Sequence, residues 1–168
     1  MKNKRKLYSP PLSKRSFIHP WNEMEYLYFK AGFWLFEGRN RHNADPFIRR
    51  LKILVTKHDP RGITILGLEG RILIADFEDK MEKEIEFTEK LASRIIKLIK
   101  IWPRCPDYDW TSVRSLYITL AMLYAENQQR VRAQKAVTRC AKFCRKHRLA
   151  LNKKQLERGR VARWPGTR

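Results

Sequence analysis

The sequence has few cysteines and no long apolar run. Three cysteines in 168 residues are an odd number in a chain large enough to form a core, which argues against a disulfide-stabilised scaffold and favours a reducing compartment. No run of about 18 apolar residues occurs, and the basic start of the chain lacks the apolar stretch of a signal peptide. We therefore expect a cytoplasmic protein with no membrane partner, or a nuclear one in a eukaryote because of the segment KNKRK.

Acidic residues are also scarce, and their shortage is confined to the two ends. The chain has 37 Lys and Arg against 17 Asp and Glu, a formal net charge of +20. Residues 1–16 hold six basic and no acidic residues, and residues 129–168 hold fourteen basic residues and one acidic residue. The charges of the intervening residues nearly balance. We expect a basic extended arm over residues 1–19, a domain over residues 20–150 and a basic tail over residues 151–168.

Apolar residues recur at helical spacing along most of residues 20–150, which predicts an all-α domain. The expected helices cover residues 21–36, 45–57, 62–75, 79–101, 111–124 and 130–148. Three sets of residues are the expected N-terminal caps: Asp45 with Pro46, Asp79 with Glu82, and Thr111.

The first expected helix, from Trp21 to Phe36, is rich in aromatic residues. Four of its aromatic residues follow one another at helical steps of three and four: Tyr26, Phe29, Phe33 and Phe36. This spacing predicts a helix that is buried over most of its surface. The alternative is a platform on which nucleic-acid bases stack.

Residues 62–77 fit two patterns. Their β-branched residues and the central Glu69-Gly70 pair could form a β-hairpin, whereas Ile63, Leu66 and Gly70 also fit helical steps. We favour a helix, because it would form a helical hairpin with the long helix that begins near Asp79. Under the β-hairpin alternative, several polar residues loosely resemble the metal site of a PD-(D/E)xK nuclease: Asp59, Asp76, Glu78, Asp79 and Lys80.

The helix expected over residues 130–148 carries two stripes with the same spacing. One stripe is small and apolar: Ala133, Val137, Cys140 and Cys144. The other is basic: Lys135, Arg139, Lys142 and Lys146. The two stripes are displaced by two residues, or about 200° of helical rotation, so we expect one side in the core and the other in solvent.

Proline spacing indicates an internal repeat. Pro20, Pro60 and Pro106 each precede a helix-turn-helix stretch, which predicts about three stacked antiparallel helical hairpins. In the third stretch Tyr117, Leu120, Ala121 and Tyr124 are followed after nine residues by Ala133, Val137 and Cys140. This pattern resembles the tetratricopeptide repeat over residues 114–147. The resemblance implies a right-handed stack of antiparallel helices and a binding role without catalysis.

Four residues have a spacing that a zinc site would allow. Cys140, Cys144 and His147 share a helical face, and Cys105 could complete four zinc ligands. The two helical cysteines also occupy the small-residue positions of the helix pair, so we expect core cysteines with no metal and no cofactor.

The excess of basic charge points to a binding function. We expect a non-enzymatic helical-repeat module that binds a polyanion, with RNA in a ribonucleoprotein favoured over DNA, and an acidic protein partner as the alternative. The candidate phosphate-binding residues are Arg132, Lys135, Arg139, Lys142, Arg145, Lys146 and Arg148. Tyr8, Phe17 and Trp164 within the basic ends could stack on bases. A metal-dependent nuclease is a distant third hypothesis.

Overall fold

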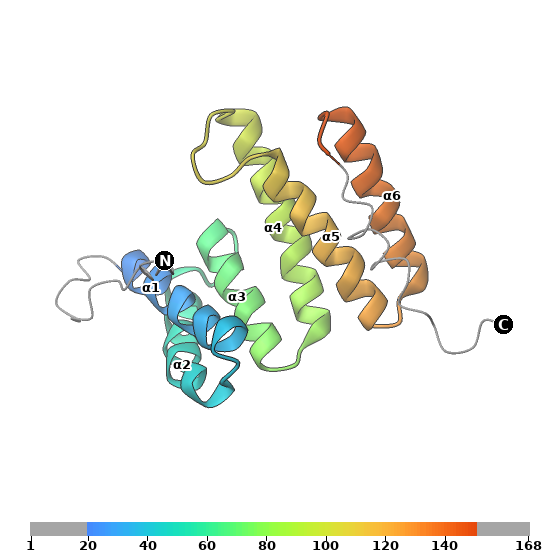
Figure 1. Ribbon diagram of the computed structural model, residues 1–168. Helices are drawn as coiled ribbons and strands as arrows, with labels where there is room; N and C mark the ends of the chain where they lie inside the picture. Colours follow the sequence, from blue (N-terminus) through green and yellow to red (C-terminus); the bar gives the residue numbers. More distant parts are fainter. Residues whose placement is uncertain (1–19, 151–168) are drawn as a thin grey trace, which may run out of the picture.

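A computed structural model describes residues 20–150, and this part of the chain is helical (Figure 1). Its elements are α1 (Pro20–Gly32), the π-helical turn η2 (Phe33–Glu37), α2 (Arg41–His58), α3 (Ile65–Phe77), α4 (Met81–Ile101), α5 (Trp110–Glu126) and α6 (Arg130–Lys146). No β-strand occurs between residues 20 and 150. The all-α prediction is confirmed, and the segment that fitted two patterns forms α3.

The helices pack mainly against their neighbours in sequence. The most extensive contacts join α5 to α6, α3 to α4 and α1 to α2, and further contacts join α2 to α3 and α4 to α5. In Figure 1, α1 and α2 lie at one end, α4 and α5 follow α3, and α6 lies at the other end. Helix α1 also packs against α3, so the first three helices contact one another.

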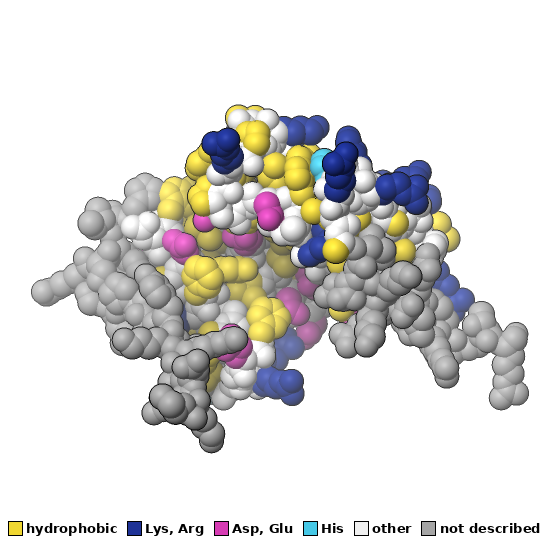
Figure 2. Space-filling model, turned by 45° about the horizontal axis from the view of Figure 1, so that its top comes forward, with side chains coloured by type: hydrophobic (Ala, Val, Ile, Leu, Met, Phe, Trp, Pro, Cys, Tyr) yellow, Lys and Arg dark blue, Asp and Glu magenta, His cyan; other side chains and the backbone are white. Residues whose placement is uncertain are grey.

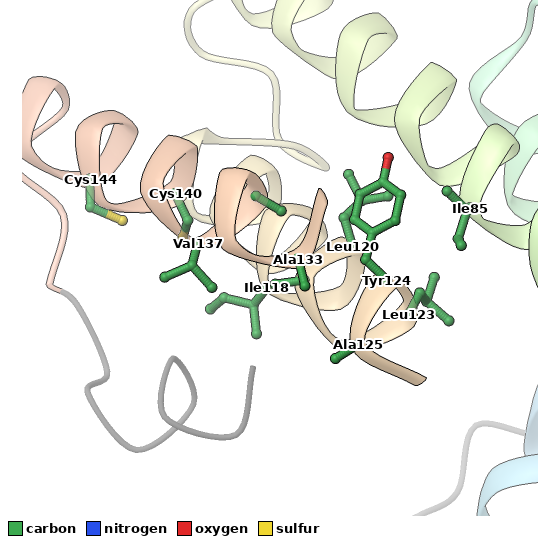
Figure 3. Packing of buried hydrophobic residues seen from close by; sticks show 12 residues of the cluster. Ile85, Ile118, Leu120, Leu123, Tyr124, Ala125, Ala133, Val137, Cys140 and Cys144 are labelled. Atoms are coloured by element: carbon green, nitrogen blue, oxygen red, sulfur yellow. The ribbon is translucent and has the colours of Figure 1, made fainter. Parts of the chain in front are cut away.

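Buried side chains form three clusters along this arrangement. The first lies among α1, α2 and α3 and includes Met24 and Leu51. The second joins α3, α4 and α5 through Leu68 and Ile95. The third joins α4, α5 and α6, and Figure 3 shows its side chains, among them Val137 from α6. Neighbouring clusters share helices, so the three clusters follow one another from α1 to α6.

The prediction for the aromatic helix is wrong in one respect. Its buried residues are Met24, Leu27 and Ala31, whereas Phe29 is 60% exposed and Phe36 is 64% exposed. The buried stripe has the same helical spacing as the predicted aromatic stripe but lies on another side of the helix. Helix α1 packs against α2 and α3 through its buried residues, which leaves Phe29 of α1 and Phe36 of η2 exposed.

The start of α2 also differs from the prediction. The helix begins at Arg41, and the Asn40 side chain accepts a hydrogen bond from the Asn43 N–H at 3.0 Å. Asp45 lies inside the helix and pairs with Arg49 at 2.6 Å. Because Asn40 already caps the first turn, Asp45 and Pro46 are not needed to start the helix.

The predicted caps of α4 and α5 are wrong as well. Asp79 has a left-handed backbone (φ 54°) and its carboxylate pairs with Arg41, so α4 starts after Lys80 without a side-chain cap. At α5 the cap is Asp109, which accepts from the Ser112 N–H at 3.0 Å. Thr111, the predicted cap, already lies within the helix. The capping side chain therefore lies two residues before the predicted one.

The loop before α3 is fixed by a buried carboxylate. Asp59 is 2% exposed and accepts hydrogen bonds from the Ile63 N–H at 3.0 Å and the Thr64 N–H at 3.2 Å. Thr64 in turn caps α3 by accepting from the Gly67 N–H at 3.1 Å. A Cβ on Gly67 would lie 2.0 Å from an Asp59 carboxylate oxygen, so the close approach requires glycine here.

None of the helices described here is long and apolar enough to cross a membrane.

Candidate polyanion-binding surface on the last helix

Helix α6 is held against the core by its small apolar side. The buried residues of this helix are Ala133, Ala136, Val137, Cys140 and Cys144. They pack with α5 residues such as Ile118 and Leu120 (Figure 3). The predicted apolar stripe is therefore confirmed as the buried side of α6, and the orientation of the rest of the helix follows from it.

The candidate basic residues are all exposed and take part in no ion pair within residues 20–150. They are Arg132, Lys135, Arg139, Lys142, Arg145, Lys146 and Arg148. Some cations elsewhere in the described chain, such as Arg50 and Lys52, pair with carboxylates. Helix α6 itself contains no acidic residue.

Three of the seven residues line a hollow. Arg132, Lys135 and Arg139 form one wall of a space of about 300 Å³, and α5 contributes Tyr117 and Tyr124. Glu89 of α4 also lines this space. The hollow thus brings together α4, α5 and α6 and places three cations beside partly apolar side chains.

A hydrogen bond and burial determine the charge states of the polar groups in the hollow. The Tyr124 hydroxyl donates a hydrogen bond to the Glu89 carboxylate. Burial, reinforced by this hydrogen bond, raises the pKa of Tyr124 to about 12. Burial also raises the pKa of Tyr117. Both tyrosines are therefore neutral near pH 7, and Glu89 is the one acidic residue that opposes the three cations of this hollow.

The other four candidate residues are not part of this hollow: Lys142, Arg145 and Lys146 lie farther along α6, and Arg148 lies two residues after its end. Lys142 and Lys146 continue the helical steps that run through Lys135 and Arg139, whereas Arg145 and Arg148 fall outside that stripe. Figure 2 shows Lys and Arg side chains gathered at its upper right, over the end of α6. The basic surface therefore extends beyond the hollow toward the end of the helix.

The four potential zinc ligands do not form a metal site. Within the part of the chain that the structure describes, no group of three or more His, Cys, Asp or Glu residues is arranged to hold a metal ion. Cys140 and Cys144 are buried, and burial raises the pKa of the Cys140 thiol to about 12. The His147 ring stacks on Trp110 with 4.1 Å between the ring centroids.

The residues of the nuclease hypothesis are also separated. Asp59 lies before the N-terminus of α3, whereas Asp76 lies in its last turn. Glu78 pairs with Lys52 at 2.5 Å and with Lys80 at 2.7 Å. Helix α3 occupies the segment in which the nuclease motif requires a strand end.

Sequence reasoning missed the composition of the hollow. Tyr117 and Tyr124 drew attention as part of a repeat pattern, but no local spacing indicates that Glu89 of α4 faces Arg132 and Lys135 of α6. The predicted stacking residues Tyr8, Phe17 and Trp164 lie outside the described residues, as do the basic arm over residues 1–19 and the basic tail over residues 151–168.

No protein-family model, curated protein or solved structure matches this chain. Its function is therefore inferred from the chemistry of the surface described above.

Proposed function

We propose that this protein is a non-enzymatic helical-repeat module that binds a polyanion through α6, with RNA in a ribonucleoprotein favoured over DNA. The observation that carries the proposal is the set of exposed cations on and just after α6, a helix with no acidic residue. The seven candidate cations make no ion pair within residues 20–150: Arg132, Lys135, Arg139, Lys142, Arg145, Lys146 and Arg148. Such a module would work in the cytoplasm, or in the nucleus of a eukaryote.

The proposal includes a tetratricopeptide-like stack of three antiparallel hairpins. Its support is the close packing of α1 with α2, of α3 with α4 and of α5 with α6. Ala121 and Ala133 are both buried where α5 meets α6, and small residues at such positions allow helices to approach closely. A scaffold of this kind would hold the basic side of α6 in a fixed orientation toward its ligand.

A polymer of phosphate groups fits this surface better than a single small anion does. The cations extend along α6 over several turns, so a polymer with regularly spaced negative charges can meet many of them at once. Binding would release condensed counterions and therefore weaken steeply as the salt concentration rises. Lys and Arg contacts to phosphate carry little sequence preference.

The test measures binding of fluorescently labelled single-stranded RNA by anisotropy across a range of salt concentrations. The variant R132Q/K135Q/R139Q removes the three cations of the hollow. We expect it to bind about tenfold or more weakly, and the slope of log affinity against log salt to fall by about 2, because three phosphate contacts are lost.

The matched control is R39Q/K57Q/R104Q. It removes the same charge from three exposed cations that have no ion pair within residues 20–150 and that do not line the hollow. We expect only a small, long-range loss of affinity. Equal losses in the two variants would show that net charge alone, and not the surface of α6, determines binding.

The alternative ligand is an acidic protein, recognised through the same cations. If the protein ignores RNA and DNA at low salt yet binds polyglutamate, the nucleic-acid proposal is wrong and the adaptor hypothesis replaces it. Competition by unlabelled DNA of the same sequence measures the expected preference for RNA.

A further inference from the structure

A second hollow adjoins the one on α6. It has a volume of about 360 Å³ and lies between the loop that precedes α3 and one side of α4. The loop contributes Arg61, Gly62 and Ile63, and α4 contributes residues that include Lys90, Arg94 and Lys97. Glu89 of α4 lines both hollows. The two spaces are thus neighbours, with α4 between them.

The cations of the second hollow exceed its available carboxylates. Glu86 is already neutralised, since Lys83 and Lys90 each approach its carboxylate at 2.8 Å. These two lysines lower the pKa of Glu86 to about 2 through their hydrogen bonds. Arg61, Arg94 and Lys97 make no ion pair and no side-chain hydrogen bond within residues 20–150, although Glu86 and Glu89 lie in the same hollow. Three charges there are left for a ligand.

A further cation lies behind the backbone of this hollow. Arg71 of α3 donates a hydrogen bond to the Asp59 carbonyl at 2.6 Å, and its Nε is buried without a hydrogen-bond partner. Its guanidinium lies 5.7 Å from the centroid of the Phe87 ring. Arg71 has no carboxylate partner within the described residues, so its charge adds to the positive potential of the hollow.

Gly62 keeps the loop close to Arg71. It has a positive φ of 58°, and a Cβ at this position would lie 3.2 Å from Arg71 Nε. Both observations favour glycine, which adopts this conformation without steric cost. The loop backbone can therefore cover Arg71 while Arg61 stays at the surface. The second hollow is built on a fixed loop, since Asp59 binds the same segment from inside.

We infer that one single strand of RNA occupies both hollows, passing from α6 across α4 to the loop before α3. This inference rests on the proposed function and specifies the form of its ligand. Arg132, Lys135 and Arg139 would contact phosphates on one side of Glu89, and Arg61, Arg94 and Lys97 would do so on the other. A flexible strand can bend into two separate recesses on either side of α4, which favours a single strand over a stiff duplex.

The test compares single-stranded oligouridylates of two lengths, about 4 and about 12 nucleotides, which span the usual site sizes of single-strand binders. The variant R61Q/R94Q/K97Q should bind the longer strand about tenfold more weakly, with a salt slope smaller by about 2. Its affinity for the shorter strand should not change. The variant R132Q/K135Q/R139Q should lose affinity for both strands.

Different results of this test would contradict the single-strand inference and the proposed function. If the α6 variant loses affinity for the longer strand and R61Q/R94Q/K97Q does not, the second hollow is not a binding site and the proposed function stands. If neither variant changes RNA binding, the proposed function fails. If a duplex of the same length binds as tightly and responds to both variants, the single-strand inference is wrong.

A loss of affinity in the variants above could also come from misfolding, so a variant that should gain affinity is a useful complement. Glu89→Gln removes the carboxylate between the two hollows and retains an oxygen that can accept from the Tyr124 hydroxyl. We expect its affinity for the longer strand to rise about threefold, because a charge of the same sign as phosphate is lost. Unchanged affinity would contradict a path past Glu89. Circular dichroism and thermal melting of each variant check that the fold is intact, with R39Q/K57Q/R104Q as the charge-matched control.

Discussion

At the scale of single residues, Glu84 has an unusual environment. This α4 residue lies near Asp76 of α3 and Glu126 of α5. Burial, reinforced by the two neighbouring carboxylates, raises the pKa of Glu84 to about 7. Three carboxylates from three helices therefore lie near one another and repel. Protonation of Glu84 removes both the cost of burying its charge and its repulsion by Asp76 and Glu126.

We predict that Glu84 makes the protein less stable as the pH rises. The pKa of Glu84 is higher in the folded chain than in the unfolded chain, so its contribution is fully present below about pH 4.5 and is lost as the pH passes about 7. After a discount for its partial exposure, the loss between pH 5 and pH 8 should be about 1 kcal/mol. Thermal melting at both pH values measures it.

Glu84→Gln should abolish this pH-dependent loss, because the side chain stays neutral. The matched control is Glu82→Gln, which changes an exposed residue one position from the start of the same helix. The control should keep the pH dependence of the wild type. An unchanged difference in melting temperature between pH 5 and pH 8 in the Glu84 variant would contradict the prediction.

Some residue-level features could be predicted from the sequence and others could not. The exposure of Lys135 and Arg139 follows from their displacement relative to Val137 and Cys140, since helical periodicity alone places them apart. The sequence did not indicate Arg61, Arg94 and Lys97 as binding residues, because they lie in the part of the chain where basic and acidic residues nearly balance. Only the folded chain shows that these three cations lack partners within residues 20–150.

At the scale of elements, α5 offers a direct test of helix capping. Asp109→Ala removes the acceptor of the Ser112 N–H and should destabilise the protein by about 1 kcal/mol. Thr111→Ala, at the residue that the sequence favoured as the cap, should cost less, because Thr111 lies within the helix. Urea unfolding of both variants measures the difference. A larger loss for Thr111→Ala would contradict the assigned cap.

The existence of the helices was predictable because apolar residues mark them over many turns. Their starts were not, because Asn40, Asp79, Asp109 and Thr111 are all acceptable caps and the choice depends on the preceding turn. Asp79 illustrates this, since its pairing with Arg41 requires the α3–α4 turn to lie beside α2. The buried side of α1 was mispredicted because its aromatic residues offered a second stripe of equal spacing.

At the scale of the whole molecule, the three core clusters predict uneven stability. Val137 is 2% exposed in the cluster of α4, α5 and α6, which contains no residue of α1 or α2. Val137→Ala should cost about 2 kcal/mol and should lower hydrogen-exchange protection in α5 and α6 more than in α1 and α2.

Leu51→Ala is the reciprocal variant, because Leu51 is fully buried in the cluster of α1, α2 and α3. It should lower protection mainly in α1 and α2. Hydrogen exchange followed by mass spectrometry locates both effects. Uniform loss of protection along residues 20–150 in either variant would mean that the domain opens as one cooperative unit, contrary to this prediction.

The two hollows are properties of the whole molecule and could not be read from the sequence. Each requires elements that are distant in the chain, such as Glu89 of α4 opposite Arg132 of α6, or Arg61 of a loop opposite Arg94 of α4. Periodicity predicts which side of a helix is exposed, but not which other exposed side it will face.

The distribution of thiols has a practical consequence. Cys140 and Cys144 are buried in the core, whereas Cys105 is half-buried in the segment between α4 and α5. The chain has only these three cysteines. A maleimide dye under native conditions should therefore attach at Cys105, so the unaltered protein offers one position for a fluorophore. Energy transfer from that dye to an end-labelled oligonucleotide would report which way a bound strand runs.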